Sequence, residues 1–291
     1  MLLLSDLSHH GLIKVHGEDA ESFLQNQLTN DIRNVTGDTF QVSAWCSPKG
    51  RIIVSFGIFK YDDAYYLSLS QDLIEKVVKK LRMYIMMSKV TVEDVTQSMS
   101  HYGISGDSIE SGLDGLLSNS SAVMKVRAAG DIPRYEMYGD KGELSSLVGQ
   151  LEVAPEYYWD YLNIVAGQPS ISLESSEAWI PQMVNLVAVE GVDFKKGCYP
   201  GQEVVARLNY LGKTKRRMYR IQADSDQLPE IGESISSEDD ADAGKILNAV
   251  INPEGKVEAL AVMKIAEASK ALSLKTSDVS ILELPYSVVD E

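Results

Sequence analysis

The chain has 291 residues with 27 basic and 42 acidic side chains, which gives a formal charge of −15 at pH 7. Its length allows one large domain or about two to three smaller ones. The sequence contains no apolar run of about 18 residues, so no transmembrane helix is expected. So acidic a chain is poorly suited to wrapping nucleic acid, because contacts to phosphate dominate that affinity.

In the N-terminal half, the hydrophobic pattern alternates between strand and helix spacing. Strands are predicted at residues 12–15, 39–46, 51–60 and 65–69, and helices at residues 19–28 and 70–85. Residues 47–50 form a good hairpin turn between the second and third of these strands. Three methionines close the second helix, and we expect Met83, Met86 and Met87 to pack in the core.

The middle of the chain is rich in Ser, Gly and Asp at residues 105–121, which predicts a loop or linker. Strands are expected at residues 122–128 and 134–138, and helices at residues 142–151 and from Pro155 onward. After Arg207, short β-rich segments alternate with acidic turns, a pattern typical of a small antiparallel barrel of about 80 residues. These segments are residues 218–223, 243–251 and 256–264.

Residues 195–207 carry the most informative pattern in the chain. Gly197 and Gly201 permit backbone angles that side chains forbid, and Pro200 followed by Gly201 suits the centre of a type II turn. Because lysines precede it and a helix is expected directly after the turn, the thiolate of Cys198 is favoured. The same pattern also fits a glycine-punctuated turn that holds a buried, inert cysteine.

The two cysteines, Cys46 and Cys198, lie far apart in sequence and form neither a disulfide framework nor a CxxC pair. Two thiols are too few for a resident metal or iron–sulfur cluster, so no metal is expected. Residues 1–4 are apolar but too short for a signal peptide, and they lack a basic start. We therefore expect a cytoplasmic protein without a membrane segment.

Basic side chains concentrate between Asp193 and Arg220, where eight basic and two acidic residues give a local charge of +6. The remainder of the chain carries −21. This basic segment is either a solvated strand and turn or a local anion site, which would suit a small carboxylated or phosphorylated ligand.

The motif Lys-Gly-Cys-Tyr-Pro-Gly-Gln-Glu at residues 196–203, followed by Arg207, closely resembles the signature of the YgfZ-type folate-binding proteins. That family is described as tRNA-modifying or iron–sulfur-cluster maintenance factors, related to the aminomethyltransferase (T-protein) of glycine cleavage. The resemblance extends, in order, across nearly the whole chain. Its further segments are Asn163-Ile164 with Ala166-Gly167, Ile180-Pro181-Gln182 with Asn185-Leu186, and Leu284-Pro285-Tyr286-Ser287.

The resemblance implies an α+β fold: a three-lobed aminomethyltransferase-like ring of two interleaved α/β lobes and a C-terminal antiparallel β-barrel. Residues 1–208 would form a folate-pocket module, with lobe 1 at about residues 1–45 and 151–208 and lobe 2 at about residues 46–150. Residues 209–291 would form the barrel.

The resemblance also implies a site for tetrahydrofolate or a derivative of it. Trp159 matches a family tryptophan implicated in folate binding, on which a flat pterin can stack, and it would share one interlobe cavity with the Cys198 motif. His10 stands where the family has a second pocket tryptophan, and the turn at residues 47–50 lacks the family's acidic residue. Cys198 is the candidate catalytic residue. The candidate folate-binding residues are Trp159, His10, Lys196, Gly197, Tyr199, Gly201, Gln202, Glu203 and Arg207.

The implied function is that of a folate-binding accessory protein rather than a conventional transferase. It would support the maintenance or repair of iron–sulfur enzymes, including those that thiolate tRNA, and thereby tRNA methylthiolation. A monomer without membrane contact or tight, direct nucleic-acid binding is expected. Two alternatives stay open: a folate-dependent aminomethyl or one-carbon transferase, identified by turnover of a methylamine donor, and a tRNA-binding accessory module, identified by steeply salt-dependent tRNA affinity.

Overall fold

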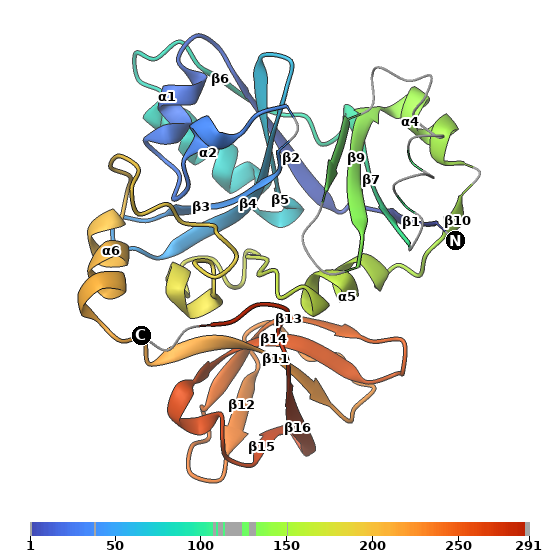
Figure 1. Cartoon of the computed structure of the whole chain (residues 1–291), viewed down its shortest axis with the longest axis vertical. Helices are drawn as coiled ribbons and strands as arrows, with labels where there is room; N and C mark the ends of the chain where they lie inside the picture. The colour runs from blue at the N-terminus through green and yellow to red at the C-terminus, as the bar shows by residue number, and fades with distance from the viewer. Residues whose placement is uncertain are drawn as a thin grey trace.

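The computed structural model describes residues 2–37, 39–106, 109, 113, 124–127, 132–149 and 151–288. Three lobes are visible in Figure 1: two α/β lobes side by side, and a β-barrel below them. The expected loop at residues 105–121 falls mostly outside the described residues. Within the described part of the chain, no helix is both long and apolar enough to cross a membrane.

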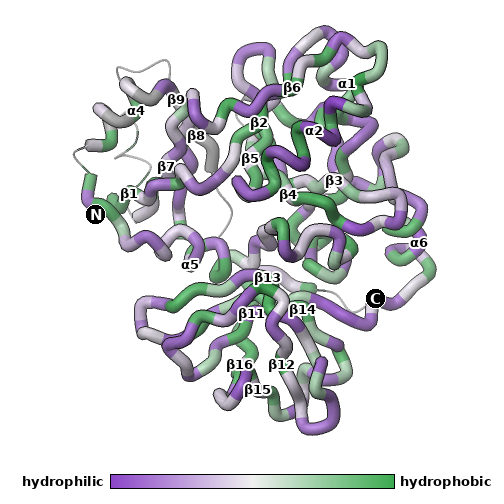
Figure 2. The backbone as a smooth tube through the Cα atoms, turned by 180° about the vertical axis from the view of Figure 1, so that it is seen from behind, coloured by the Kyte–Doolittle hydropathy of each residue, from purple (hydrophilic) through white to green (hydrophobic). Residues whose placement is uncertain are grey.

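The first lobe is built on a five-stranded sheet with the order β3-β4-β5-β2-β6. Its strands are β2 (His10–His16), β3 (Gln41–Cys46), β4 (Ile52–Tyr61), β5 (Ala64–Ser70) and β6 (Thr91–Asp94). Its helical segments are α1 (Ala20–Gln25), η1 (Ile32–Asn34), η2 (Gln71–Leu73) and α2 (Ile74–Tyr84). Figure 2 shows a hydrophobic stretch along β4, whose β-branched and aromatic side chains suit a strand buried in a core.

The buried side of α2 comes from Ile74, Val77, Val78 and Leu81, which recur at helical spacing. The expectation that the three following methionines join the core is wrong, because Met83, Met86 and Met87 are 73%, 90% and 96% exposed. The core-facing positions of the helix end at Leu81, and the chain beyond it turns outward before β6.

The second lobe is built on a sheet with the order β10-β1-β7-β9-β8. Its strands are β1 (Leu3–Asp6), β7 (Met99–Ser105), β8 (Met124–Arg127), β9 (Arg134–Asp140) and β10 (Glu152–Val153), and its helix is α4 (Lys141–Val148). Leu4, Ile104, Met137 and Leu144 belong to one buried cluster, so α4 and the sheet share a core.

The two lobes are interleaved, but the expected boundary between residues 45 and 46 is wrong. Trp45 and Cys46 of β3 pair with Val54 and Ile52 of β4 in a single hairpin, and strands joined by so short a turn lie side by side in one sheet. The first-lobe sheet therefore runs from residue 10 to residue 94. The second lobe takes β1 from the N-terminus and resumes at residue 99.

Residues 154–215 connect the lobes to the barrel through α5 (Tyr158–Val165), η3 (Pro181–Val184) and α6 (Gln202–Leu211). The barrel closes in the order β11-β14-β13-β12-β15-β16, which confirms the predicted C-terminal antiparallel barrel. Its elements are β11 (Arg216–Ala223), β12 (Ser234–Ser237), β13 (Gly244–Ile251), β14 (Val257–Lys264), η4 (Ile265–Glu267), β15 (Leu272–Leu274) and β16 (Ser277–Leu282). After β16, the Tyr286 hydroxyl donates a hydrogen bond to the Gly167 carbonyl at 2.8 Å, which holds the end of the described chain against the connecting segment.

Candidate functional site

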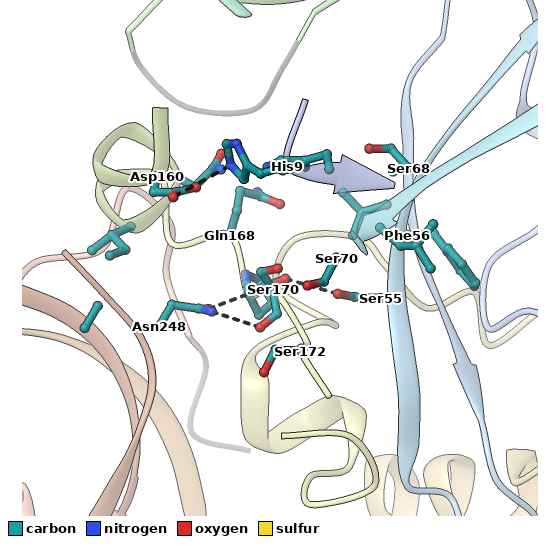
Figure 3. Close-up of a pocket in the computed structure, with 18 of the residues that line it drawn as sticks. His9, Ser55, Phe56, Ser68, Ser70, Asp160, Gln168, Ser170, Ser172 and Asn248 are labelled. Carbon is teal, nitrogen blue, oxygen red and sulfur yellow. Dashed lines mark hydrogen bonds and ion pairs between the residues drawn. The ribbon is translucent and has the colours of Figure 1, made fainter. Parts of the chain in front are cut away.

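A cavity of about 380 Å3, here called the interlobe cavity, lies where both lobes meet the barrel. Phe40 and β4 line it from the first lobe, β9 from the second lobe, α5 from the connecting segment and β13 from the barrel. Figure 3 shows labelled side chains from β4, α5 and β13 around the same space. Pockets shared between lobes are a common location for small-molecule sites.

Hydrogen bonds fix one side of the interlobe cavity. Asn248 on β13 accepts a hydrogen bond from the Ser170 N–H at 3.0 Å and donates one to the Ser170 carbonyl at 3.0 Å. The Ser55 hydroxyl on β4 accepts a hydrogen bond from the Ile171 N–H at 3.2 Å. The segment around Ser170 is therefore held between the barrel and the first lobe (Figure 3).

The opposite side carries a buried polar cluster. His101 Nε2 lies 2.8 Å from Glu136 Oε2, and the Tyr138 hydroxyl donates to the same carboxylate. Burial alone would raise the pKa of Glu136, but hydrogen bonds from His101 and Tyr138 outweigh it and hold that pKa at about 2. Burial, with His101 adding to it, lowers the pKa of His10 to about 3. At neutral pH this wall therefore presents a charged carboxylate and a neutral His10 imidazole.

A second cavity, of about 1200 Å3, adjoins the first. It is called here the Lys195 cavity, since Lys195 lines it together with Phe194 and Tyr210. Phe40 and Gln168 line both cavities, so the two spaces meet at these side chains. A ligand longer than the interlobe cavity can extend past Phe40 into the Lys195 cavity.

Of the predicted site residues, His10 lines the interlobe cavity but Trp159 does not. The indole is 1% exposed, and a Cβ added to Gly103 of β7 would lie 2.3 Å from its ring. On another side, the Arg134 guanidinium carbon lies 4.8 Å from the ring centroid. The expected pterin-stacking surface is therefore occupied by the protein itself, and Trp159 supports the cavity wall from behind.

Lys196 of the motif has a buried structural role. Its Nζ donates hydrogen bonds to the carbonyls of Gln25 at 2.7 Å, Leu28 at 2.5 Å and Asn30 at 2.8 Å. These carbonyls lie at the C-terminal end of α1 and just beyond it, where unpaired acceptors and the helix dipole favour a cation. Burial lowers the pKa of Lys196 to about 8, so it remains mainly an ammonium at neutral pH.

The middle of the motif packs against the β3–β4 turn. Gly201 has φ +83°, and a Cβ there would lie 2.5 Å from the Ser47 carbonyl oxygen. Only glycine meets both requirements without strain. Gly201 is the N-cap of α6, which begins at Gln202 as predicted. Tyr199 is buried beside the Lys196 ammonium, which lies 5.4 Å from its ring centroid.

The rest of the motif faces outward. Gly197, Cys198, Glu203 and Arg207 are exposed, and Gln202 is half-buried. Among the described residues that line the interlobe cavity, none belongs to residues 196–207. The expectation that Trp159 and the motif face one shared cavity is therefore wrong. Lys196 anchors the motif beside α1, whereas Trp159 is buried against β7.

The basic segment is also dispersed by the fold. Lys213, Lys215 and Arg217 line a separate cavity of about 860 Å3 between α6 and the barrel. Arg220 lies 2.6 Å from Glu258 in an ion pair. Of the basic residues in this segment, only Lys195 lines the Lys195 cavity, where Glu190 and Asp193 are also present. The segment therefore does not form a single anion site at the interlobe cavity.

The two cysteines are expected to differ strongly in reactivity. Cys198 is exposed, which rules out the buried, inert alternative, whereas Cys46 is buried and burial raises its pKa to about 12. With iodoacetamide at neutral pH, we expect Cys198 to be alkylated at least roughly a hundredfold faster, because the thiolate is the nucleophile. Peptide mapping with and without denaturant measures this. Earlier labelling of Cys46 would contradict the structure.

Sequence reasoning missed most residues that line the interlobe cavity, because they come from separate elements. Arg134 and Glu136 gave one usable signal: two charged residues at alternate positions of a predicted strand lie on the same face. Asn163 belongs to a segment that resembles the family, but only the tertiary structure shows that it lines the cavity. Gln168 and Asn248 carried no signal.

The fold and this site can now be compared with known proteins. Residues 2–130 match the GCVT N-terminal domain family. The structure is similar to the crystal structure of glycine cleavage system aminomethyltransferase T from Bartonella henselae, with a TM-score of 0.71 and 15% identity, covering 98% of this chain and 86% of that chain. The chain thus has the aminomethyltransferase-like fold, with a mixed α/β body and a closed barrel.

Two curated relatives narrow the assignment. The tRNA-modifying protein YgfZ of Aliivibrio fischeri is 30% identical over 300 residues, covering 99% of this chain and 93% of the relative. The protein of the same name from Colwellia psychrerythraea is 29% identical over 316 residues, covering 99% and 94%. The chain belongs to the YgfZ family.

Proposed function

We propose that this protein binds a tetrahydrofolate in the interlobe cavity and supports tRNA modification by maintaining or repairing iron–sulfur enzymes. The observation that carries the proposal is the interlobe cavity itself, which is lined by both lobes and the barrel in a YgfZ-family chain. The role in tRNA modification follows the name of the relatives, and the link to iron–sulfur enzymes follows the family resemblance.

The residues of the cavity suit a pterin. Phe40 offers an aromatic face, and Asn163 and Gln168 offer amide groups that can both donate to and accept from a heterocycle edge. Burial lowers the pKa of Arg134 to about 10, so its guanidinium stays charged at neutral pH. The anionic glutamate end of a folate would extend past Phe40 toward Lys195 in the adjoining cavity.

Cys198 is assigned a different place in this proposal. Its thiol is on the outer surface, beyond the residues that line the interlobe cavity. A partner macromolecule can reach it there, whereas a small ligand bound in the cavity cannot. Cys198 therefore remains a candidate reactive residue toward a client protein, with folate bound separately.

We expect tetrahydrofolate to bind, and Phe40→Ala to weaken the affinity roughly tenfold, because it removes the stacking face where the two cavities meet. Gln168→Ala tests the same place without removing an aromatic ring from the core. Tyr157→Ala is the matched control, since the exposed Tyr157 lines neither the interlobe cavity nor the Lys195 cavity. Isothermal titration calorimetry provides the affinities.

Failure of folates to bind at millimolar concentration would contradict the proposal. Equal affinities for the Phe40, Gln168 and Tyr157 variants would place the ligand elsewhere. The same preparations separate the alternatives: turnover of an aminomethyl donor with tetrahydrofolate would favour the transferase, and tRNA affinity that falls steeply with salt would favour the tRNA-binding module.

A further inference from the structure

The chain crosses from the second lobe to the first between β1 and β2, and two histidines lie at this crossing. His9 and His10 face Asp160 of α5, and each of the three side chains offers one ligand atom within 4.8 Å of the others. His9 Nε2 lies 4.0 Å from Asp160 Oδ2. Figure 3 shows His9 and Asp160 pointing toward one another at the edge of the interlobe cavity. Among the residues that the structure describes, this is the only such group of three.

We propose that His9, His10 and Asp160 bind a divalent transition-metal ion of the Zn2+ or Fe2+ type at the edge of the interlobe cavity. Two imidazoles and one carboxylate form a donor set that these ions favour. Three protein ligands leave at least one coordination position open, and all three of these side chains line the cavity. An oxygen or nitrogen donor of a cavity ligand, or a water molecule, can complete the coordination.

The spacing allows an ion after a modest movement of the side chains. With metal–ligand distances near 2.1 Å, donor atoms of a tetrahedral site lie about 3.4 Å apart. The His9–Asp160 separation is 4.0 Å, and the three donor atoms lie within 4.8 Å of one another. The donor atoms must therefore approach by up to about 1.4 Å, and His9 and Asp160, whose side chains are both 48% exposed, have room to move.

The surroundings hold the third ligand in place and favour a cation. The His10 ring meets the His101 ring edge-on, with centroids 5.5 Å apart and planes at 88°. His101 is itself fixed by its 2.8 Å contact with Glu136. Asp160 and the charged Glu136 carboxylate bring two negative charges to this wall, whereas Arg134 brings one positive charge. Outer groups that orient a metal-bound histidine are typical of functional metal sites.

The test is metal binding by the full-length protein, without folate, after removal of metals with a chelator. We expect one Zn2+ per chain by equilibrium dialysis with metal analysis. We also expect Co2+ to give a visible spectrum with the intensity of a four- or five-coordinate site. His9→Ala and Asp160→Asn should each weaken Zn2+ binding at least tenfold. Both changes are at partly exposed positions, and thermal melting verifies the fold.

His16→Ala is the matched control. His16 is another partly exposed histidine beside a carboxylate, 3.0 Å from Glu93, but it belongs to no group of three ligands among the described residues. We expect it to bind Zn2+ like the wild type. Absence of saturable Zn2+ binding below about 100 μM, or equal affinities in the His9, Asp160 and His16 variants, would overturn the proposal. Neither result bears on folate binding. The metal proposal can therefore be wrong while the proposed folate-binding function still holds.

Discussion

Trp159→Ala is expected to lower the free energy of unfolding by about 3–5 kcal/mol, the usual cost of truncating a fully buried aromatic side chain. The indole is 1% exposed and packs with Leu7 and Leu162. The cavity left by the substitution cannot close readily, because the β7 backbone at Gly103 packs directly against the ring and cannot move like a side chain. Arg134 would also lose its cation–π partner in a buried position. Chemical denaturation followed by circular dichroism measures the change.

Tyr157→Ala is the control for Trp159→Ala. Tyr157 is the N-cap of the same helix and is 36% exposed, so its removal should cost less than about 1 kcal/mol. A Trp159→Ala protein with unchanged stability but lost folate affinity would contradict this expectation. It would favour the hypothesis that the pterin stacks directly on Trp159. The expected result is lower stability, with ligand affinity preserved in the fraction that stays folded.

Lys196→Met is expected to cost about 3 kcal/mol of stability. It keeps the apolar stem of the side chain but removes the donor to three backbone carbonyls, those of Gln25, Leu28 and Asn30. Hydrogen bonds from a charged donor are among the stronger ones, and buried acceptors left without a partner carry a desolvation penalty. The turn between α1 and η1 should loosen first, which hydrogen exchange of residues 26–31 would report.

Lys195→Met is the matched control, because Lys195 is the exposed neighbour in the same loop. Its replacement should change stability by less than about 0.5 kcal/mol. Equal effects of the two substitutions would show that burial of the Lys196 ammonium is not what holds the motif. A loss of folate affinity in Lys196→Met, without loss of stability, would return Lys196 to the binding site.

Local patterns predicted local structure well. The alternation at residues 51–60 became β4, the helical spacing from Leu73 to Leu81 became the buried face of α2, and the Pro-Gly turn led into α6 at the expected residue. Strand, helix and turn formation here depend on residues only a few positions apart, and this spacing can be read directly from the sequence. The methionines after Leu81 were the exception, because apolar character does not say where the core ends.

The sequence by itself determined the family, the strands β2 to β5 with the helix α2, the C-terminal barrel and the helix that follows the Cys198 motif. Only the tertiary structure decided that β3 and β4 share one sheet with β2, that Trp159 is buried against Gly103, and that Lys196 binds carbonyls about 170 residues earlier in the chain. It also brought His9, His10 and Asp160 together at one cavity. The physical reason is that burial and contact between distant segments depend on which faces of separate elements meet, and no local spacing records that choice.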